Sequence, residues 1–196
     1  MIPLVIGLTG GIGSGKSTIA KVFSTCGIPV YNSDSAAKRA YYNDRIKENV
    51  LKLLGVSSYL KSGELNRKYV SKLIFSNQKL RTQLNDLIHP YVAKDFDEWC
   101  ASKFKFPFVV KETALLFETG MYKNVFKRVL VTAPEAIKIE RVMTRDGVEK
   151  SEVEMRMKAQ MGDEKKIPQA DFVINNNGEE LIVPELIKWI DSLTLK

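Results

Sequence analysis

The stretch GLTGGIGSGKSTIAKVF, residues 7–23, places five glycines within nine residues and follows them with Lys-Ser-Thr and an apolar-periodic segment. Gly10, Gly15, Lys16 and Ser17 fit the phosphate-binding pattern G-x-x-x-x-G-K-[ST] in full. An apolar run that we interpret as a buried strand precedes the pattern, and a helical pattern follows it, which is the context that such a loop requires. A glycine-rich turn with a chance Lys-Ser pair is the alternative. The context favours a nucleoside triphosphate site.

The residue types in this loop suit the binding of phosphate. Glycine lets the backbone take positive φ and turn its N–H groups inward, and the N-terminus of the following helix adds its own amides. Lys16 can reach the β and γ phosphates, and the Ser17 hydroxyl can ligate Mg²⁺. We therefore expect ATP contacts, with Lys16 as the catalytic cation, from Gly11, Ile12, Gly13, Ser14, Gly15, Lys16, Ser17 and Thr18.

Composition and net charge limit the kinds of binding partner that we expect for this protein. The chain has 196 residues, a hydrophobic fraction of 44% and a net charge of +7. We expect one domain, and no apolar run is long enough to span a bilayer. The N-terminal residues lack the basic start of a signal peptide, so we predict a cytoplasmic protein. Because the lysines are spread along the chain and not interleaved with aromatic residues, we expect no nucleic acid and no membrane as partner, but a basic cleft for an anionic small molecule.

Histidine and cysteine offer little for catalysis or metal binding. His89 is the only histidine, and Cys26 and Cys100 lie far apart without metal-ligand spacing. A histidine-based metal site and a Ser-His-Asp triad are therefore disfavoured, and we expect both cysteines to be reduced, packed thiols.

Short apolar runs alternate with helical patterns along the chain. We expect strands at residues 3–9, 28–32, 106–112, 127–133 and 170–176. Their nearly continuous apolar character is typical of a parallel sheet that is covered by helices on both faces. The sequence therefore predicts the α/β class, in the three-layer arrangement of a P-loop NTPase fold.

A long helical segment interrupts this alternation. Residues 35–104 hold helical periodicity without a convincing strand, and we interpret them as an insertion that binds the acceptor substrate. His89-Pro90 should kink or interrupt a helix there, because proline lacks an N–H and clashes with the preceding turn.

A second excursion, residues 146–168, is charged and poor in large aliphatic side chains, as expected for a mobile lid with few packing contacts. Ser151 and Glu154 have the spacing of a capping box, which predicts a helix beginning there. The P-loop kinase domain, residues 1–196, then consists of this lid, the insertion 35–104, and a core of residues 1–34, 105–145 and 169–196.

Three classes of nucleotide-binding protein compete: a small-molecule kinase, a GTPase switch and an ATPase motor. A GTPase needs an N-K-x-D element that reads the base, and the nearest asparagine cluster, NNNG at residues 175–178, lacks it. A motor domain is usually larger. A helical insertion after the second strand and a late lid are the plan of a kinase, whose lid excludes water and limits wasteful hydrolysis.

The sequence also resembles a known family. The segments VYNSDSAAKRAY, LIHPYV, LLFETGMY, RVLVTAPEAIKIERVMTRDG, MKAQM and DFVINNNG follow the glycine loop in this order, and together they resemble dephospho-CoA kinases along nearly the whole chain. The resemblance implies transfer of the ATP γ-phosphoryl group to the ribose 3′-hydroxyl of dephospho-CoA, the last step of coenzyme A synthesis, with Mg²⁺ as cofactor. A nucleoside or nucleotide kinase of the same fold is the alternative, followed by a nucleotide-gated binding switch. We expect a monomer or a weak homo-oligomer.

The resemblance also implies an acceptor site. Asp34 matches the second acid of the family's D-x-D after strand two and would act as base or orienter for the acceptor hydroxyl, whereas Asn32 replaces the first acid. The alternative for Asp34 is an N-cap of the helix that follows it. His89 matches a position near the acceptor, with a polar residue beside the proline as the alternative. Leu116 and Phe117 match the P-L-L-F-E run and would line the acceptor pocket or the core.

The remaining candidates surround the phosphates. Glu112 stands where the family has aspartate, at a strand end from which a carboxylate holds a water of the Mg²⁺ shell. Arg145 and Arg156 are candidates for a catalytic phosphoryl clamp, because a guanidinium binds phosphate bidentately, and Arg141 lies just before the lid. Solvated helix charges are the alternative for these arginines. Asn175 belongs to the loop that lies near the adenine in the family.

Overall fold

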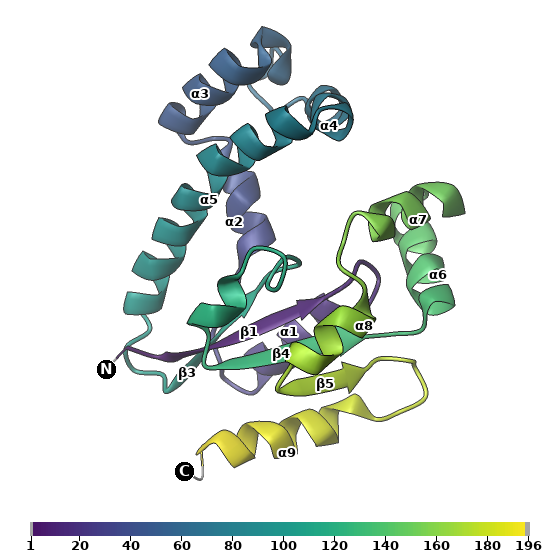
Figure 1. Ribbon diagram of the computed structural model, residues 1–196. Coiled ribbons are helices and arrows are strands. Elements are labelled where there is room, and N and C mark those ends of the chain that lie inside the picture. Colours follow the sequence, from purple (N-terminus) through teal and green to yellow (C-terminus); the bar gives the residue numbers. More distant parts are fainter. Residues whose placement is uncertain (1, 195–196) are drawn as a thin grey trace. The chain divides into compact units, whose positions relative to one another are not determined.

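The computed structural model describes residues 2–194, and the chain divides into two compact units (Figure 1). The first unit comprises the residues up to Tyr31 and those from Lys103 onward, and the second comprises Asn32–Ser102. Each unit has its own hydrophobic core.

A five-stranded sheet organises the first unit. Its strands are β1 (Leu4–Gly10), β2 (Val30–Asn32), β3 (Phe108–Glu112), β4 (Lys127–Thr132) and β5 (Phe172–Asn175). The spatial order is β2-β3-β1-β4-β5, and β1 pairs in parallel with β3 and β4, as β4 does with β5. The predicted parallel sheet is confirmed, and Leu8 pairs with Glu112, so that β1 and β3 end at the same edge.

Apolar residues at alternate positions along the strands form one face of this sheet, and helices cover that face. Ile6 and Leu8 of β1 are fully buried against α1 (Lys16–Thr25) and α9 (Ile182–Thr194). On the other face Leu116 packs over Gly7, where an added Cβ would lie 2.9 Å from its Cδ2. In Figure 1, α8 (Asp163–Lys166) lies in front of the sheet and α1 behind it. The three-layer α/β arrangement follows.

The segment predicted as a loosely held lid is packed. After η2 (Met121–Asn124) and β4, α6 (Glu135–Asp146) contacts α7 (Lys150–Lys158), and the fully buried Val153 of α7 joins Ile139 and Val142 of α6 in a small core. The chain then forms α8 and η3 (Ile167–Gln169). The expectation of few packing contacts is wrong here, because one valine suffices to dock a short helix.

The predicted capping box is also wrong. α7 begins at Lys150 after Glu149, which makes no side-chain cap, so Ser151 lies inside the helix. The pattern S-x-x-E is therefore present in the sequence but does not cap the start of this helix.

The second unit is helical, as the sequence predicts. It contains α2 (Ser33–Ala40), α3 (Asp44–Leu54), η1 (Val56–Ser58), α4 (Arg67–Ser76) and α5 (Gln78–Ala101). Its core joins Ile46, Val50 and Leu54 of α3 to Leu84 and Ile88 of α5.

Each of the four α-helices of this unit begins with an asparagine cap. The side-chain oxygens of Asn32, Asn43, Asn66 and Asn77 each accept a hydrogen bond from the backbone N–H three residues ahead. Asn32 therefore caps α2, and Asp34 lies in its first turn. The alternative that made Asp34 the N-cap is wrong.

Of the two effects expected at His89-Pro90, a kink or an interruption of the helix, the interruption does not occur. α5 runs through Pro90 without interruption from Gln78 to Ala101. A proline inside a helix costs about 3 kcal/mol through the lost hydrogen bond and the ring clash. Contacts of α5 with α2, α3 and α4 outweigh that cost, and buried residues lie on both sides of the proline, at Ile88 and Phe96.

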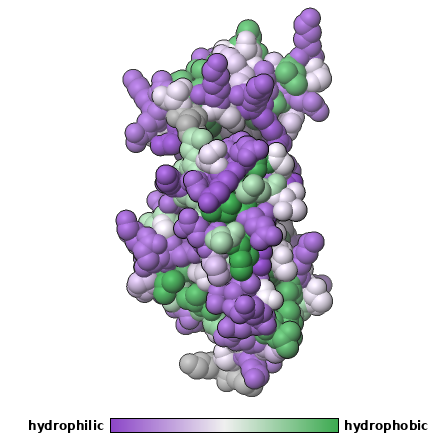
Figure 2. Space-filling model, turned by 90° about the vertical axis from the view of Figure 1, so that its right-hand side faces the viewer, coloured by the Kyte–Doolittle hydropathy of each residue, from purple (hydrophilic) through white to green (hydrophobic). Residues whose placement is uncertain are grey.

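Among residues 2–194 no helix is both long and apolar enough to cross a membrane. Hydrophilic residues cover most of the face drawn in Figure 2, with hydrophobic residues in separate groups. Neither cysteine forms a disulfide; Cys100 is buried as expected, whereas Cys26 is exposed. The cytoplasmic location and the oligomeric state stay predictions.

The cap assignment predicts how α2 responds to mutation. Asn32→Ala should lower the free energy of unfolding by about 1 kcal/mol, because the Ser35 N–H loses its acceptor. Asn43→Ala, which removes the same kind of cap from α3, is the matched control and should cost a similar amount. Asp34→Ala should cost less. Urea unfolding measures all three, and a larger loss for Asp34→Ala than for Asn32→Ala would contradict the assignment.

Candidate active site

The loop between β1 and α1 takes the shape of a phosphate cradle. Gly13 and Gly15 have φ of 78° and 88°, in the left-handed region, and Gly15 is the N-cap of α1. An added Cβ would collide with the Lys138 carbonyl at Gly13 and with the Asn176 side chain at Gly15. A glycine N-cap offers no side-chain acceptor, so the amides that open α1 face no competing cap.

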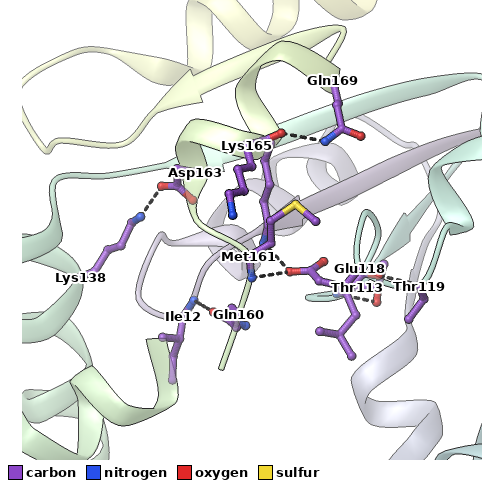
Figure 3. Close-up of polar contacts among 12 residues, drawn as sticks. Ile12, Thr113, Glu118, Thr119, Lys138, Gln160, Met161, Asp163, Lys165 and Gln169 are labelled. Carbon is purple, nitrogen blue, oxygen red and sulfur yellow. Dashed lines mark hydrogen bonds and ion pairs between the residues drawn. The ribbon is translucent and has the colours of Figure 1, made fainter. Parts of the chain in front are cut away.

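Two carboxamide side chains hold this loop from outside. The Ile12 N–H donates to Gln160 Oε1 at 2.9 Å, as Figure 3 shows. Asn176 Nδ2 donates to the Ser14 carbonyl at 2.8 Å, and the backbone N–H of Asn176 donates to the Thr132 carbonyl at 2.7 Å. One backbone N–H and one backbone carbonyl of the loop are thus hydrogen-bonded to segments that lie far away in the sequence.

The neighbouring asparagine named from the sequence, Asn175, is exposed at the end of β5. Gln160 and Asn176 were not named, although both stand in segments that carry the family resemblance, MKAQM and DFVINNNG.

Lys16, Ser17 and Glu112 converge as the sequence predicts. Lys16 Nζ lies 3.6 Å from Glu112 Oε1, and the Ser17 hydroxyl donates to the same oxygen at 3.4 Å. Glu112 is only 4% exposed, because it is the last residue of β3, which pairs with β1 inside the sheet. The arrangement brings a cation, a hydroxyl and a carboxylate to the mouth of the cradle, where hard oxygen donors suit Mg²⁺.

Arg141 of α6 lies closest to the loop among the three arginines considered. Its Nη1 would be 3.7 Å from a Cβ placed on Gly15. This nitrogen is buried and has no hydrogen-bond partner among the residues that the structure describes. A buried guanidinium nitrogen without an acceptor is costly, so its position beside the cradle indicates an anionic ligand.

Arg145 and Arg156 instead share a carboxylate. Arg145 donates to both oxygens of Asp146, at 2.7 Å and 3.0 Å, and Arg156 Nη1 donates to Asp146 Oδ2 at 2.9 Å. The hydrogen bonds of Arg145 lower the pKa of Asp146 to about 2, with a further contribution from Arg156. Arg156 also pairs with Glu152. The two predicted clamp residues therefore lie together, but both of them bind the carboxylate of Asp146.

The segment that follows α7 is anchored to the body of the first unit, and Figure 3 shows its contacts. Glu118 Oε1 accepts from the Met161 N–H at 3.1 Å and lies 2.8 Å from Lys166 Nζ. Lys166 is fully buried, and Asp163 pairs with the largely buried Lys138 of α6. These contacts fix the backbone that follows Gln160, whose oxygen reaches the loop.

The predicted acceptor residues are divided between the units. In the first unit Leu116 is fully buried and Phe117 is 4% exposed, with its ring 5.6 Å from that of Tyr122, so both belong to the interior. In the second unit Asp34 and His89 are exposed on α2 and α5.

A glycine cradle of this shape, at the end of β1 in a parallel sheet, is typical of P-loop proteins that bind nucleoside triphosphates. The family described as dephospho-CoA kinase matches residues 4–181, and the chain belongs to this family.

Individual relatives agree. A dephospho-CoA kinase of Bacteroides fragilis is 34% identical over 97% of this chain and 93% of its own length. One of Porphyromonas gingivalis is 36% identical over 98% and 96%. A solved structure of a Thermus thermophilus protein is 33% identical, covers 98% of both chains and superposes with a TM-score of 0.89.

The Glu118–Lys166 pair provides a test of the anchor. Glu118→Gln should lower the free energy of unfolding by about 3–5 kcal/mol, because Lys166 would stay buried without a counter-charge. The double variant Glu118→Gln/Lys166→Met should recover most of this loss, since a packed apolar chain replaces the charge. Lys52→Met, which breaks the exposed pair with Glu48, is the control and should leave thermal unfolding nearly unchanged. A Glu118→Gln variant as stable as the wild type would contradict the anchor.

Proposed function

We propose that this protein transfers the γ-phosphoryl group of ATP to the ribose 3′-hydroxyl of dephospho-CoA, which yields coenzyme A and ADP. Membership of the dephospho-CoA kinase family over residues 4–181 carries the proposal. The convergence of Lys16, Ser17 and Glu112 at the glycine loop supports it, because a kinase of this class needs a cation and metal-binding oxygens beside the phosphates.

ATP would bind through the glycine loop. The backbone from Gly11 to Thr18 and the N-terminus of α1 would receive the phosphates, and Lys16 would neutralise charge on the β and γ groups. Arg141 would supply its buried Nη1 to a phosphate oxygen, which would remove the unsatisfied donor. Asn175 would lie near the adenine, where its exposure leaves it accessible.

The residues at the mouth of the cradle fit a magnesium ion. Ser17 would hold it through the hydroxyl, and Glu112 through a water, because the exposed Ser17 hydroxyl already lies 3.4 Å from a carboxylate oxygen of the buried Glu112. The described residues contain no group of three or more histidine, cysteine or acidic side chains placed to hold a metal. Mg²⁺ usually takes one or two protein ligands together with substrate phosphates, whose charge it neutralises.

The acceptor would be held by the helical unit. Asp34 stands two residues after the end of β2, so its carboxylate would accept the hydrogen bond of the ribose hydroxyl and aim the oxygen at the γ-phosphorus. Phosphoryl transfer passes through a loose transition state, in which positioning counts more than early deprotonation. His89, exposed on α5, would contact the acceptor as well. Leu116 and Phe117 support the site from the interior.

The two arginines on Asp146 would act only after an exchange of partners. Arg145 and Arg156 would release Asp146 and bind phosphate oxygens, because both anions suit the planar guanidinium fork. The exchange is cheap, since exposed ion pairs contribute at most about 1 kcal/mol. The part of residues 146–168 that precedes Gln160 would close over the phosphates in this step, hinged on the anchored segment that follows.

Acceptor choice tests the proposal directly. An ADP-release assay that offers dephospho-CoA, AMP, CMP and adenosine in parallel should show a preference for dephospho-CoA by orders of magnitude. Lys16→Ala gives the background and should lower kcat by about 10²–10³, since it removes one preorganised charge from the transition state. Equal turnover of AMP or CMP would indicate a nucleotide kinase of the same fold instead.

Asp34 provides the sharpest test of the acceptor site. Asp34→Asn should lower kcat by about 10²–10⁴, because the amide keeps the shape but lacks the charge and basicity of the carboxylate. The KM for ATP and the melting temperature should stay near wild type, since Asn32 is the cap of α2. Asp44→Asn, which removes the first-turn acid of α3, is the matched control and should turn over normally. Wild-type kcat in Asp34→Asn would remove Asp34 from the mechanism.

A further inference from the structure

One face of α2 carries polar residues in line with Asp34. Lys38 follows Asp34 at a spacing of four residues, which lies on one side of α2, and Tyr41 and Tyr42 come directly after the end of the helix. Ser33, Ala36 and Ala40 are buried on the other side. Asp34 and Lys38 are both exposed and form a polar stripe along α2, whereas Tyr41, which follows the helix, packs against the core of the helical unit.

This stripe leads into a cavity of about 180 Å³ between α2 and the start of α4, wholly within the second unit. Lys38 and Arg67 contribute two cations to its lining, and Leu65, Val70 and Ile74 contribute apolar side chains. None of the described residues that line it is acidic. The pocket therefore suits a ligand with an anionic group beside an apolar one.

The walls of the pocket are held in place without a ligand. The Tyr59 hydroxyl donates to the Tyr41 carbonyl at 2.8 Å, which fixes the end of α2. Asn66 caps α4 directly before Arg67, and Val70 is 4% exposed in the core. Burial raises the pKa of the Tyr41 phenol.

The distance from Asp34 matches the shape of the acceptor. A helix rises about 1.5 Å per residue, so Lys38 lies about 6 Å along α2 from Asp34, and the two tyrosines follow the last residue of the helix, Ala40. In dephospho-CoA the 5′ carbon of the ribose that bears the reacting 3′-hydroxyl carries a diphosphate, and the pantetheine arm follows. When the 3′-hydroxyl lies at Asp34, the diphosphate and the pantetheine arm must extend from the ribose along α2 over this distance.

We propose that the pocket between α2 and α4 is the subsite for the diphosphate and the first part of the pantetheine arm, and this inference rests on the proposed function. Lys38 and Arg67 bind the diphosphate, and Leu65, Val70 and Ile74 receive the arm. At about 180 Å³ the pocket holds only part of the acceptor. The subsite selects dephospho-CoA over acceptors that lack an arm, because only the complete acceptor reaches both Asp34 and the pocket.

The test compares two double variants that remove the same charge. Lys38→Met/Arg67→Met removes the cations of the pocket, and Lys68→Met/Lys72→Met removes two exposed cations of α4 that do not line it. The first should raise the KM for dephospho-CoA by about 10–100-fold, the loss expected for charge-assisted contacts to an anion. Its kcat at saturation, its KM for ATP and its slow turnover of adenosine should match those of the second variant.

Calorimetry with 4′-phosphopantetheine tests the pocket apart from catalysis. This probe carries a phosphate and the arm but no adenosine, so it should bind the wild type and the Lys68→Met/Lys72→Met variant and fail to bind Lys38→Met/Arg67→Met. A wild type that phosphorylates dephospho-CoA, with equal KM values in both double variants, would overturn the subsite and leave the proposed function standing. A wild type that binds the probe at the pocket but phosphorylates no dephospho-CoA would overturn the function alone.

Discussion

The amide groups that open α1 receive no side-chain cap, because Gly15 stands where other helices of this protein carry asparagine. An uncapped helix start preceded by glycines at positive φ is a poor structure by itself, and it needs support from elsewhere. Gln160 and Asn176 supply that support by pairing with the backbone of the loop. Their own positions depend on further contacts, from Glu118 with Met161 to the pairing of β4 and β5.

The two units solve the problem of helix ends in opposite ways. In the helical unit an asparagine side chain satisfies the first turn of every α-helix, so each helix start is specified by residues next to it. In the unit with the sheet, the start of α1 is held by residues far away in the chain and stays available to phosphate. The helices of the second unit are therefore capped locally, whereas the uncapped start of α1 leaves its amides available to a phosphate.

The same difference between local and distant contacts separates the site residues that the sequence predicts from those that it does not. Gly15, Lys16, Ser17 and Glu112 were recognised because their chemistry needs fixed spacing or a fixed strand end, and the structure brings the last three together. Gln160 and Asn176 carry no periodicity, and a single amide in a loop has no partner until the chain folds. Arg141 was passed over for Arg145 and Arg156, since helical phase alone does not show which arginine meets the loop and which meets Asp146. The capping box at Ser151 and the break at Pro90 failed because packing of α7 and α5 overrides local signals.

The braces of the glycine loop have a consequence for the order of folding. Ile12 and Gln160 are 148 residues apart in the chain, and Ser14 and Asn176 are 162 apart. Contacts of such sequence separation close late, because the entropy of a long loop must be lost before they form. During synthesis the phosphate loop emerges well before its two clamps. A ribosome-bound chain that stops before residue 160 therefore carries the complete nucleotide motif without the means to hold its shape, and competence for phosphate arrives only after Asn176 has emerged.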